Sequence, residues 1–460
     1  GGTLMNYLEK DKLYCSQGDT SGKHKPKKIF IGAEDCYLFD ECSVKYLDMQ
    51  MYNSAANFGY KNKAYSECIK NCLETLPCLA GEFMSKSRIE LSEAICQYMY
   101  RNYGVRGRVH FTVGGAQAVD DAMKITINHN HKRGFLAFEG AYHGRTMAAS
   151  SVSSSYRYTR QFGSVMNVQR IPFSNCFTCA YDKNPTDCDL YCLKKFKQKF
   201  KSEFSGFYDK NHSDAAYSAF IFEPVLGRGG YVFPHEKYYS ELCAFLREHN
   251  ILVVSDEVQM GFYRTGKLWS FEHYNFIPDI IIFGKAITNG LWPLSGIWAR
   301  EELISDKVWP VGSTHCTFAG HPMGTQLGLC TFNIIEQDNF LPTISKSSEL
   351  LEHCIARIVS DYSCLGRFQI KGHAVGIDIV HPDTQQPWPE LAHILIETAL
   401  KEPITINQVK YGLILTAGGM FNSSLMLSPC LYMTDDDINK FDILFRTYLS
   451  RVITRHKEEI

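Results

Sequence analysis

The chain has 460 residues, of which 45% are hydrophobic and 21% are charged, and its formal net charge is -1. This length and apolar content allow a large core and predict more than one domain. The balanced charge, with no long basic or acidic block, argues against nucleic-acid binding and against electrostatic attachment to membranes.

The sequence also indicates where the protein resides. We find no apolar run long enough to span a bilayer and no secretory leader, and we interpret Gly1 to Thr3, ahead of Met5, as an expression remnant. The 17 cysteines are scattered through a chain with an even mix of charges. We therefore expect a cytoplasmic protein with mostly free thiols.

The first predicted elements are short strands in residues 1–63. The stretch "CYLFDECSVKYLDM" alternates apolar and polar residues on both sides of a turn at Asp40-Glu41, which is typical of a hairpin. Helical periodicity then dominates from Ala64 to Tyr100. We expect residues 1–63 to be part of a small domain.

Strands and helices alternate through the middle of the chain. The strands are indicated by "RVHFTV", "GFLAFEG", "YSAFIFEPV", "NILVVSDEV" and "PDIIIFGKA", and a helix begins near Ala116. Lys194 to His212 is predicted to form an amphipathic surface helix and a loop. Strands separated by helices imply crossover connections, and hence a mostly parallel sheet with helices on both faces.

The predicted fold class is α/β, with two domains. Residues 64–325 are expected to form the large domain around the parallel sheet. Residues 326–460 begin with a long helix after Pro322, continue with short strands and helices, and join residues 1–63 in a smaller α+β domain.

Residues that are unusual for a core follow three of the predicted strands. Lys285 ends a run of four apolar residues, Asp256 ends another, and Gly114-Gly115 stand between a strand and a helix. Ligands bind at the carboxyl ends of strands in open parallel sheets. Lys285 could reach solvent along its flexible stem, form a structural ion pair with Asp256, or hold a carbonyl covalently.

The third possibility corresponds to a specific cofactor. Pyridoxal phosphate requires a lysine for its aldehyde, a carboxylate for its pyridine nitrogen and an anion cradle for its phosphate. Lys285, Asp256 and the Gly114-Gly115 turn match these requirements. Tyr142, after another strand, supplies an aromatic ring that can stack on the cofactor.

Four segments of the chain resemble the hallmark segments of the class III aminotransferases: "SDEVQMGFYRTGKLWSFEH", "PDIIIFGKAI", "EGAYHGRT" and "STHCTFAGHP". The likeness runs from about Ile31 to the C-terminus, with the segments in the family's order and spacing. Four matches are far more specific than one motif. The resemblance implies a fold type I transferase with pyridoxal 5'-phosphate as its cofactor, in a homodimer with shared active sites.

The resemblance also implies a role for each matched residue. Lys285 would form the Schiff base with the cofactor, and Asp256 would pair with the pyridine nitrogen. Further implied contacts are Val258 and Tyr142 on the two ring faces, Gln259 near the phenolic oxygen, His143 and Gly144 beside the ring, the backbone N–H groups of Gly115 and Ala116 at the phosphate, Thr317 at the phosphate of the other subunit, and Glu223 as a carboxylate near the cofactor. Glu223 and His143 could instead only satisfy local hydrogen bonds.

The phosphate turn departs from the family pattern. Relatives commonly have serine-glycine there and a glutamate two residues later, whereas this chain has Gly114-Gly115 and Gln117. One hydroxyl contact is therefore missing, and we expect the cradle to depend more on backbone N–H groups.

The substrate side departs from the pattern as well. Arg228, in "EPVLGRGG", stands where ornithine and 4-aminobutyrate enzymes carry a glutamate. The arginine positions of two family subgroups correspond to Met426 and Thr416. Arg228 could bind a substrate carboxylate, or it could face solvent or pair with a neighbouring carboxylate. Tyr52, in "MYNSAA", is expected to line the substrate entrance.

A group of four cysteines requires a separate interpretation. Cys176, Cys179, Cys188 and Cys192 have a Cys-x-x-Cys start that suits zinc or an iron–sulfur cluster, and some relatives carry similar cysteines. Free or redox-active thiols are the interpretation that we favour, so we predict no metal.

Together these features predict an aminotransferase that moves an amino group from a primary amine or an ω- or α-amino acid to a keto acid such as pyruvate or 2-oxoglutarate. A racemase, aminomutase or decarboxylase on the same scaffold would share every cofactor residue named above. A catalytically silent dimer is the third hypothesis, and the intact Lys285 and Asp256 argue against it. No nucleic-acid or membrane partner is expected.

Overall fold

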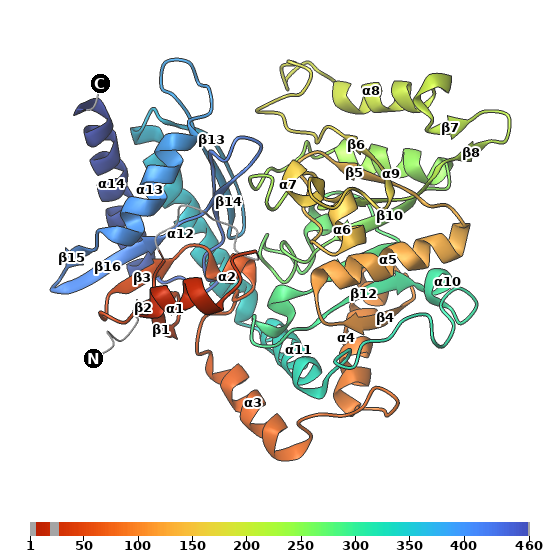
Figure 1. The fold of residues 1–460 in the computed structure, drawn as a ribbon, viewed down its shortest axis with the longest axis horizontal. Helices are drawn as coiled ribbons and strands as arrows, with labels where there is room; N and C mark the ends of the chain where they lie inside the picture. The colour runs from red at the N-terminus through yellow and green to blue at the C-terminus, as the bar shows by residue number, and fades with distance from the viewer. Residues whose placement is uncertain (1–5, 19–26, 459–460) are drawn as a thin grey trace.

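The computed structural model describes residues 6–18 and 27–458 of the chain. Gly1 to Thr3, interpreted above as an expression remnant, lie outside the described residues. Figure 1 shows two bodies side by side, with the middle of the chain in the larger one and both chain ends in the smaller one.

A seven-stranded sheet forms the centre of the larger body, in the order β4-β12-β11-β10-β9-β5-β6. The pairs between β11, β10, β9, β5 and β6 are all parallel, and only β12 runs antiparallel to both of its neighbours. The mostly parallel sheet is thereby confirmed. Its strands are β4 (Gly107–Thr112), β5 (Gly134–Phe138), β6 (Asn167–Ile171), β9 (Tyr217–Phe222), β10 (Leu252–Asp256), β11 (Ile280–Phe283) and β12 (Ser295–Arg300).

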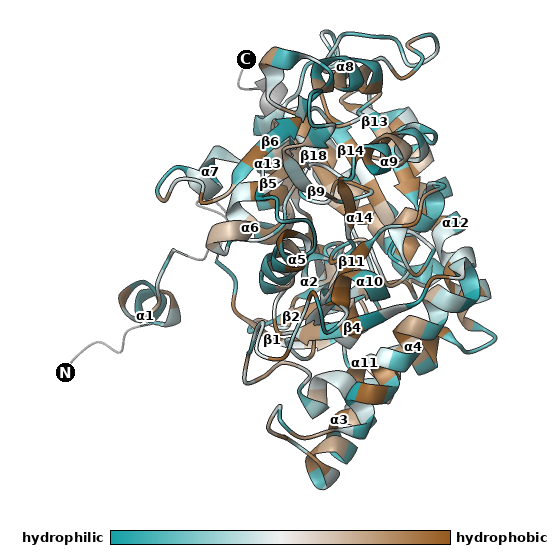
Figure 2. Cartoon of the chain, turned by 90° about the vertical axis from the view of Figure 1, so that its right-hand side faces the viewer, coloured by the Kyte–Doolittle hydropathy of each residue, from teal (hydrophilic) through white to brown (hydrophobic). Residues whose placement is uncertain are grey.

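The central strands are buried on both faces, as their continuous apolar runs predict. Along β11, Ile280 and Ile282 pack into the cluster under α5 (Gly115–Asn130), whereas Ile281 and Phe283 pack into an aromatic cluster on the opposite face. The other helices of this body are α3 (Lys63–Thr75), α4 (Lys86–Tyr103), α6 (Met147–Val152), α7 (Tyr156–Thr159), α8 (Tyr191–Phe200), α9 (Tyr238–Glu248), α10 (Glu301–Ile304) and α11 (Pro322–Ile335). In Figure 2 the central strand β11 is hydrophobic, and the helices around the sheet carry both hydrophilic and hydrophobic residues.

Two features of this body were not predicted from the sequence. The helical periodicity from Ala64 to Tyr100 belongs to two helices, because the chain leaves α3 at Thr75 and enters α4 only at Lys86. Pro77 lies between them and cannot donate the backbone hydrogen bond that a continuous helix needs. Strand β12 was not predicted from the sequence, although it completes the sheet beside β11.

The smaller body joins the two ends of the chain. Strand β3 (Lys45–Asp48) forms a hairpin with β2 (Tyr37–Asp40), as predicted, and pairs in parallel with β16 (Val409–Ile414). The sheet also contains β1 (Phe30–Glu34) and β15 (Ile404–Ile406), and a second sheet contains β13 (Leu365–Lys371), β14 (Ala374–Ile379), β17 (Ala417–Gly418) and β18 (Ser424–Leu427). Helices α12 (Phe340–Asp361), α13 (Pro389–Lys401) and α14 (Asp435–Glu458) cover them. We keep 63/64 and 325/326 as proposed domain boundaries, and the second of them falls inside α11 (Pro322–Ile335).

Two short segments of the N-terminal region are unusual. Helix α1 (Tyr7–Tyr14) buries none of its residues and stands apart from the body of the molecule in Figure 2. Helix α2 (Met51–Ser54) is a left-handed turn in which all four residues have positive φ angles. Such backbone costs energy for residues other than glycine, and it is found most often at functional sites.

The described helices also bear on membrane insertion. Within residues 6–18 and 27–458, no helix is both long enough and apolar enough to cross a bilayer.

Candidate active site

Lys285 lies two residues after Phe283, the last residue of β11, and begins a short 3-10 helix (Lys285–Thr288). Gly284, between strand and helix, has no room for a side chain, because a Cβ there would lie 2.5 Å from Ser295 Oγ. Within the described residues, Lys285 Nζ makes no hydrogen bond or ion pair. Burial lowers the pKa of Lys285, and the charges of Asp256 and Glu223 oppose that effect. The amine is thus held close to two carboxylates without being bonded to either, a suitable state for a nucleophile.

Asp256 is the last residue of the neighbouring strand β10 and is 5% exposed. Its Oδ2 lies 2.7 Å from His143 Nδ1, and its Oδ1 accepts a hydrogen bond of 3.1 Å from the Val258 N–H. The buried Nε2 of His143 has no partner among the described residues. His143 and Val258 therefore fix the direction of the Asp256 carboxylate, and the spacing of these residues in the sequence does not reveal this arrangement.

Glu223, near Lys285, joins two loops through its carboxylate. Its Oε1 accepts from the Tyr142 N–H and its Oε2 accepts from the Gly227 N–H, each at 2.9 Å. Gly227 is required at its position, because a Cβ there would lie 2.7 Å from Glu223 Oε2 and 2.5 Å from Gln259 Oε1. Burial, with a further contribution from Asp256, raises the pKa of Glu223 to about 7, and His143 opposes the rise.

The N-terminus of α5 forms an anion cradle. Its N-cap residue, Gly114, provides no side-chain cap, and the N–H groups of Gly115 and Ala116 make no hydrogen bond within the described residues. Gly144, at φ +113°, touches this turn: a Cβ there would lie 2.3 Å from the Ala116 Cβ. A Cβ at Gly115 would contact Val258 Cγ1 at 3.1 Å. Free N–H groups and the helix dipole favour an anion at this point.

The structure brings together most of the predicted cofactor residues. Tyr142 is half-buried and packs edge-to-face with Tyr158, with 5.4 Å between ring centroids. Gln259 donates through Nε2 to the Tyr231 hydroxyl at 2.9 Å. Tyr231 was not identified from the sequence, because nothing in "GRGGY" indicates its contact with Gln259. Hydrogen bonds, close contacts and chain neighbours connect the predicted residues Gly115, Ala116, Tyr142, His143, Gly144, Glu223, Asp256, Val258 and Gln259, and Lys285 lies near Asp256 and Glu223 of this group.

Two predicted residues lie farther out. Thr317 is exposed and makes no hydrogen bond within the described residues. The loop just before it, Thr314 to Cys316, borders a cavity of about 410 Å³ that Thr112 and Gln117 also line. Tyr52 is 63% exposed, and its ring packs against Gly290, where an added Cβ would lie 2.9 Å from Tyr52 Cδ1.

The four cysteines lie together and away from Lys285. All are free thiols, and with His235 they line one cavity of about 20 Å³. Ser174 hydrogen bonds to the thiols of both Cys176 and Cys192, and burial raises the pKa of each. No group of three or more metal-ligating side chains in the described part of the chain is arranged to hold an ion. The raised pKa values favour the neutral thiol at Cys176 and Cys192.

The structure also shows the two positions at which family subgroups carry an arginine, Met426 and Thr416. Met426 and Thr416 are both buried, and the Met426 N–H donates to the Thr416 carbonyl at 3.0 Å. Neither side chain offers a charge to a carboxylate. Arg228, one residue after Gly227, is half-buried and donates through Nη1 to the Ala417 carbonyl at 2.8 Å.

These residues fit pyridoxal phosphate. The buried amine of Lys285, which has no partner in the part of the chain that the structure describes, matches the aldehyde. The oriented carboxylate matches the pyridine nitrogen, and the uncapped helix terminus matches the phosphate. The fit rests on the donor set itself and on the close approach that Gly144 and Gly284 allow.

Comparison with known proteins agrees with this chemistry. The family model described as "Aminotransferase class-III" matches residues 21–447. The chain is 27% identical to a "Probable 4-aminobutyrate aminotransferase" of Bacillus subtilis, over 95% of this chain and 96% of that protein. It is 29% identical to an "Alanine/serine racemase" of Pyrococcus horikoshii, over 86% and 80%.

Solved structures show the same fold. An ω-transaminase from Pseudomonas jessenii superposes with a TM-score of 0.85 at 21% identity, covering 98% of this chain and 99% of that one. A transaminase from a marine Virgibacillus gives a TM-score of 0.84 at 22% identity, covering 97% and 99%. The predicted fold type I architecture is confirmed.

Proposed function

Because the chain belongs to the class III aminotransferase family, we propose that Lys285, Asp256 and the N-terminus of α5 carry out pyridoxal-phosphate-dependent transamination. The enzyme would move an amino group from a primary amine or an ω- or α-amino acid to a keto acid such as pyruvate or 2-oxoglutarate. The observation that carries the proposal is the amine of Lys285, which has no partner among residues 6–18 and 27–458 and lies near the His143–Asp256 pair.

The cofactor, when bound, supplies an electron sink for the bond that breaks next to the substrate nitrogen. Lys285 would hold the cofactor aldehyde covalently and, once released by the incoming amine, would carry the proton between substrate carbon and cofactor. Its lowered pKa supports this role, because a larger share of the amine is neutral and able to accept a proton.

The other residues would hold and orient the cofactor. Asp256 would keep the pyridine nitrogen protonated, and its hydrogen bonds with His143 and Val258 support a fixed position for the carboxylate. The N–H groups of Gly115 and Ala116 would take the phosphate. We assign Val258 and Tyr142 to the two ring faces, Gln259 to the phenolic oxygen, His143 and Gly144 to the side of the ring, and Glu223 to the support of the two loops that it joins.

We further propose a cytoplasmic homodimer in which Thr317 reaches the phosphate bound to the other subunit. The exposure of Thr317 supports the proposal. Tyr52 is proposed to border the substrate entrance, since its ring lies against Gly290, five residues after Lys285. Sedimentation analysis would test the dimer, and a Thr317→Ala dimer with unchanged cofactor affinity would contradict the assigned contact.

The experiment that tests the main proposal is the visible spectrum of the purified protein while single amines are added without keto acid. Stable loss of the enzyme-bound cofactor band, together with release of a carbonyl product, is expected for at least one donor. Lys285→Ala is the matched control and should show neither the band of covalently held cofactor nor the reaction. A wild-type protein that develops no such band after cofactor is added would refute the proposal.

Racemisation is the second candidate, because two relatives are named racemases: the Pyrococcus horikoshii protein above and a "Leucine/methionine racemase" of Thermococcus litoralis at 28% identity. All the cofactor residues proposed here would serve that reaction too. Chiral chromatography of the same reactions separates the two activities. Appearance of the opposite enantiomer, with no keto acid formed and the band retained, would favour the racemase.

A further inference from the structure

The loop that carries Arg228 is held on both sides. Toward the active site, the Gly227 N–H donates to Glu223. Toward the smaller body, the Arg228 carbonyl accepts from the Gly419 N–H at 3.0 Å. The loop is therefore a fixed link between Glu223, which lies beside Lys285, and the C-terminal strands.

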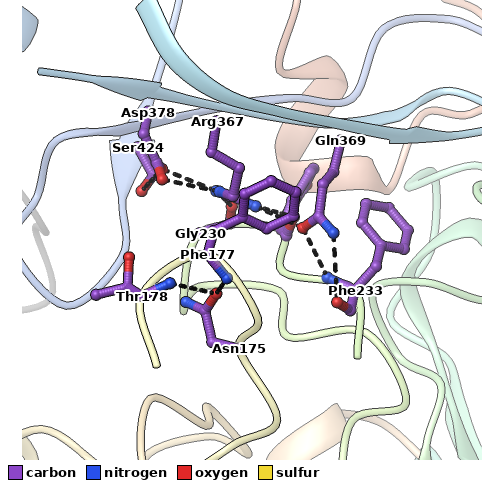
Figure 3. A network of polar contacts seen from close by, with 10 residues as sticks. Asn175, Phe177, Thr178, Gly230, Phe233, Arg367, Gln369, Asp378 and Ser424 are labelled. Atoms are coloured by element: carbon purple, nitrogen blue, oxygen red, sulfur yellow. Dashed lines mark hydrogen bonds and ion pairs between the residues drawn. The ribbon is translucent and has the colours of Figure 1, made fainter. Parts of the chain in front are cut away.

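Arg367 of β13 holds the far end of the same loop. It donates through Nη2 to the Gly230 carbonyl at 2.9 Å and through Nη1 to the Tyr231 carbonyl at 3.1 Å. Figure 3 shows its guanidinium between Gly230 and the carboxylate of Asp378, which accepts from Nε and Nη2 and also from Ser424. Arg367 is thus neutralised by a carboxylate, and its function is to position the loop.

Arg228 differs from Arg367 in its environment. Its one hydrogen bond in the described residues goes to the neutral Ala417 carbonyl, and no carboxylate there forms an ion pair with it. Burial lowers the pKa of Arg228, the charges of Arg157 and Arg145 lower it further, and Tyr158 and Tyr142 oppose them. A half-buried guanidinium without a counter-ion, among other cations, is costly for the protein alone.

The same environment places Arg228 beside the proposed cofactor site. Its neighbour Tyr142 is the proposed ring-stacking residue, and Glu223 holds the backbone of both Tyr142 and Gly227. A substrate amine that displaces Lys285 would bring its own anionic group close to Tyr142 and to this uncompensated charge. The buried Met426 and Thr416 offer no competing charge.

From this geometry we propose that Arg228 is a specificity-determining residue that binds a carboxylate of the amine donor or of the keto acid acceptor. The inference rests on the proposed function. It names carboxylated donors as the preferred class, because the guanidinium fork pairs with a carboxylate through two hydrogen bonds. An uncharged amine of the same length would leave Arg228 without its counter-ion.

The test compares half-reactions of matched donors, followed as the loss of the cofactor band. The pairs are 4-aminobutyrate with pentylamine and β-alanine with butylamine. Wild type is expected to react faster with the carboxylated member of a pair. In Arg228→Met, the second-order rate constant for the carboxylated donor divided by that for its uncharged partner should fall about 10- to 100-fold. A loss of this size corresponds to losing hydrogen bonds to a charged group. Arg228→Lys should lie between the two, because lysine keeps the charge but not the fork.

The control is Arg160→Met, which removes an exposed arginine from a nearby segment and should leave the ratio unchanged. A purely structural role of Arg228 would lower both constants of a pair equally, and that result would overturn the inference. Wild type preferring the uncharged donor would overturn it too. If no amine reacts with wild type, the proposed function fails as well, whereas a reacting Arg228→Met with the wild-type ratio refutes only the role of Arg228.

Discussion

Replacing Gly144 by alanine tests the anion cradle at its closest contact. Gly144 has φ +113°, and an added Cβ would lie 2.3 Å from the Ala116 Cβ and 2.7 Å from its Cα. The backbone strain should cost about 1–2 kcal/mol and the steric overlap about 1–3 kcal/mol more. Relief requires Ala116 to move, and its N–H group is one of the two proposed to hold the phosphate.

Two measurements follow from this reasoning. Urea unfolding without cofactor should show a free energy of unfolding lowered by about 2–5 kcal/mol in Gly144→Ala. Titration with pyridoxal phosphate, followed by absorbance, should show affinity weakened by at least about tenfold, because a displaced N–H group loses a charge-assisted hydrogen bond.

Gly163→Ala is the matched control. Gly163 has φ +74°, but an added Cβ would meet nothing within 4 Å. This variant should lose only the strain contribution, about 1–2 kcal/mol, and should bind the cofactor normally. In Gly144→Ala, adding Ala116→Gly removes the closest clash and should recover part of the lost stability. If Gly144→Ala and Gly163→Ala behave alike in both assays, the close approach of Gly144 to the cradle is not what makes glycine necessary.

Three further predictions follow. Lys285→Ala should lower the transamination rate by at least about 10³-fold while cofactor still binds non-covalently, and an unchanged rate would contradict the role of this amine. Because burial lowers the Lys285 pKa, covalent capture of added cofactor should accelerate with rising pH around a midpoint below 10.5. Asp256→Asn removes a negative charge and should move that midpoint lower. Stopped-flow absorbance measures the midpoint in both proteins, and a higher midpoint in Asp256→Asn would contradict the prediction. Dialysis against a chelator should change neither activity nor urea stability, and stoichiometric zinc found by metal analysis would refute the assignment of Cys176 and Cys192 as neutral thiols.

The sheet and its two central side chains could be predicted because their signals are local. Four consecutive apolar residues before Lys285, and a similar run before Asp256, indicate strands buried on both faces, and position at a strand end indicates a ligand site. The bond between His143 and Asp256 could not be predicted this way, because it joins residues 113 positions apart. It depends on which strands become neighbours in the sheet.

Other features depend on tertiary contacts that periodicity does not encode. Strand β12 contains Gly296, whose added Cβ would lie 2.5 Å from the His110 carbonyl, so its place in the sheet depends on close packing and not on alternation. The break between α3 and α4 was missed because the apolar spacing continues across Pro77. The assignment of Thr317 depends on a second subunit, and no signal within one chain can test it.

The pairing of β3 with β16 determines when this protein can fold. The hairpin that contains β3 leaves the ribosome early, but its parallel partner is synthesised roughly 360 residues later. At about 5–20 residues per second, the hairpin waits roughly 20–70 s with one edge unpaired. The larger body can close around its sheet during that interval, whereas the smaller body is completed only after β16 has been synthesised. Chaperones that shield exposed strand edges would act on the N-terminal segment until then.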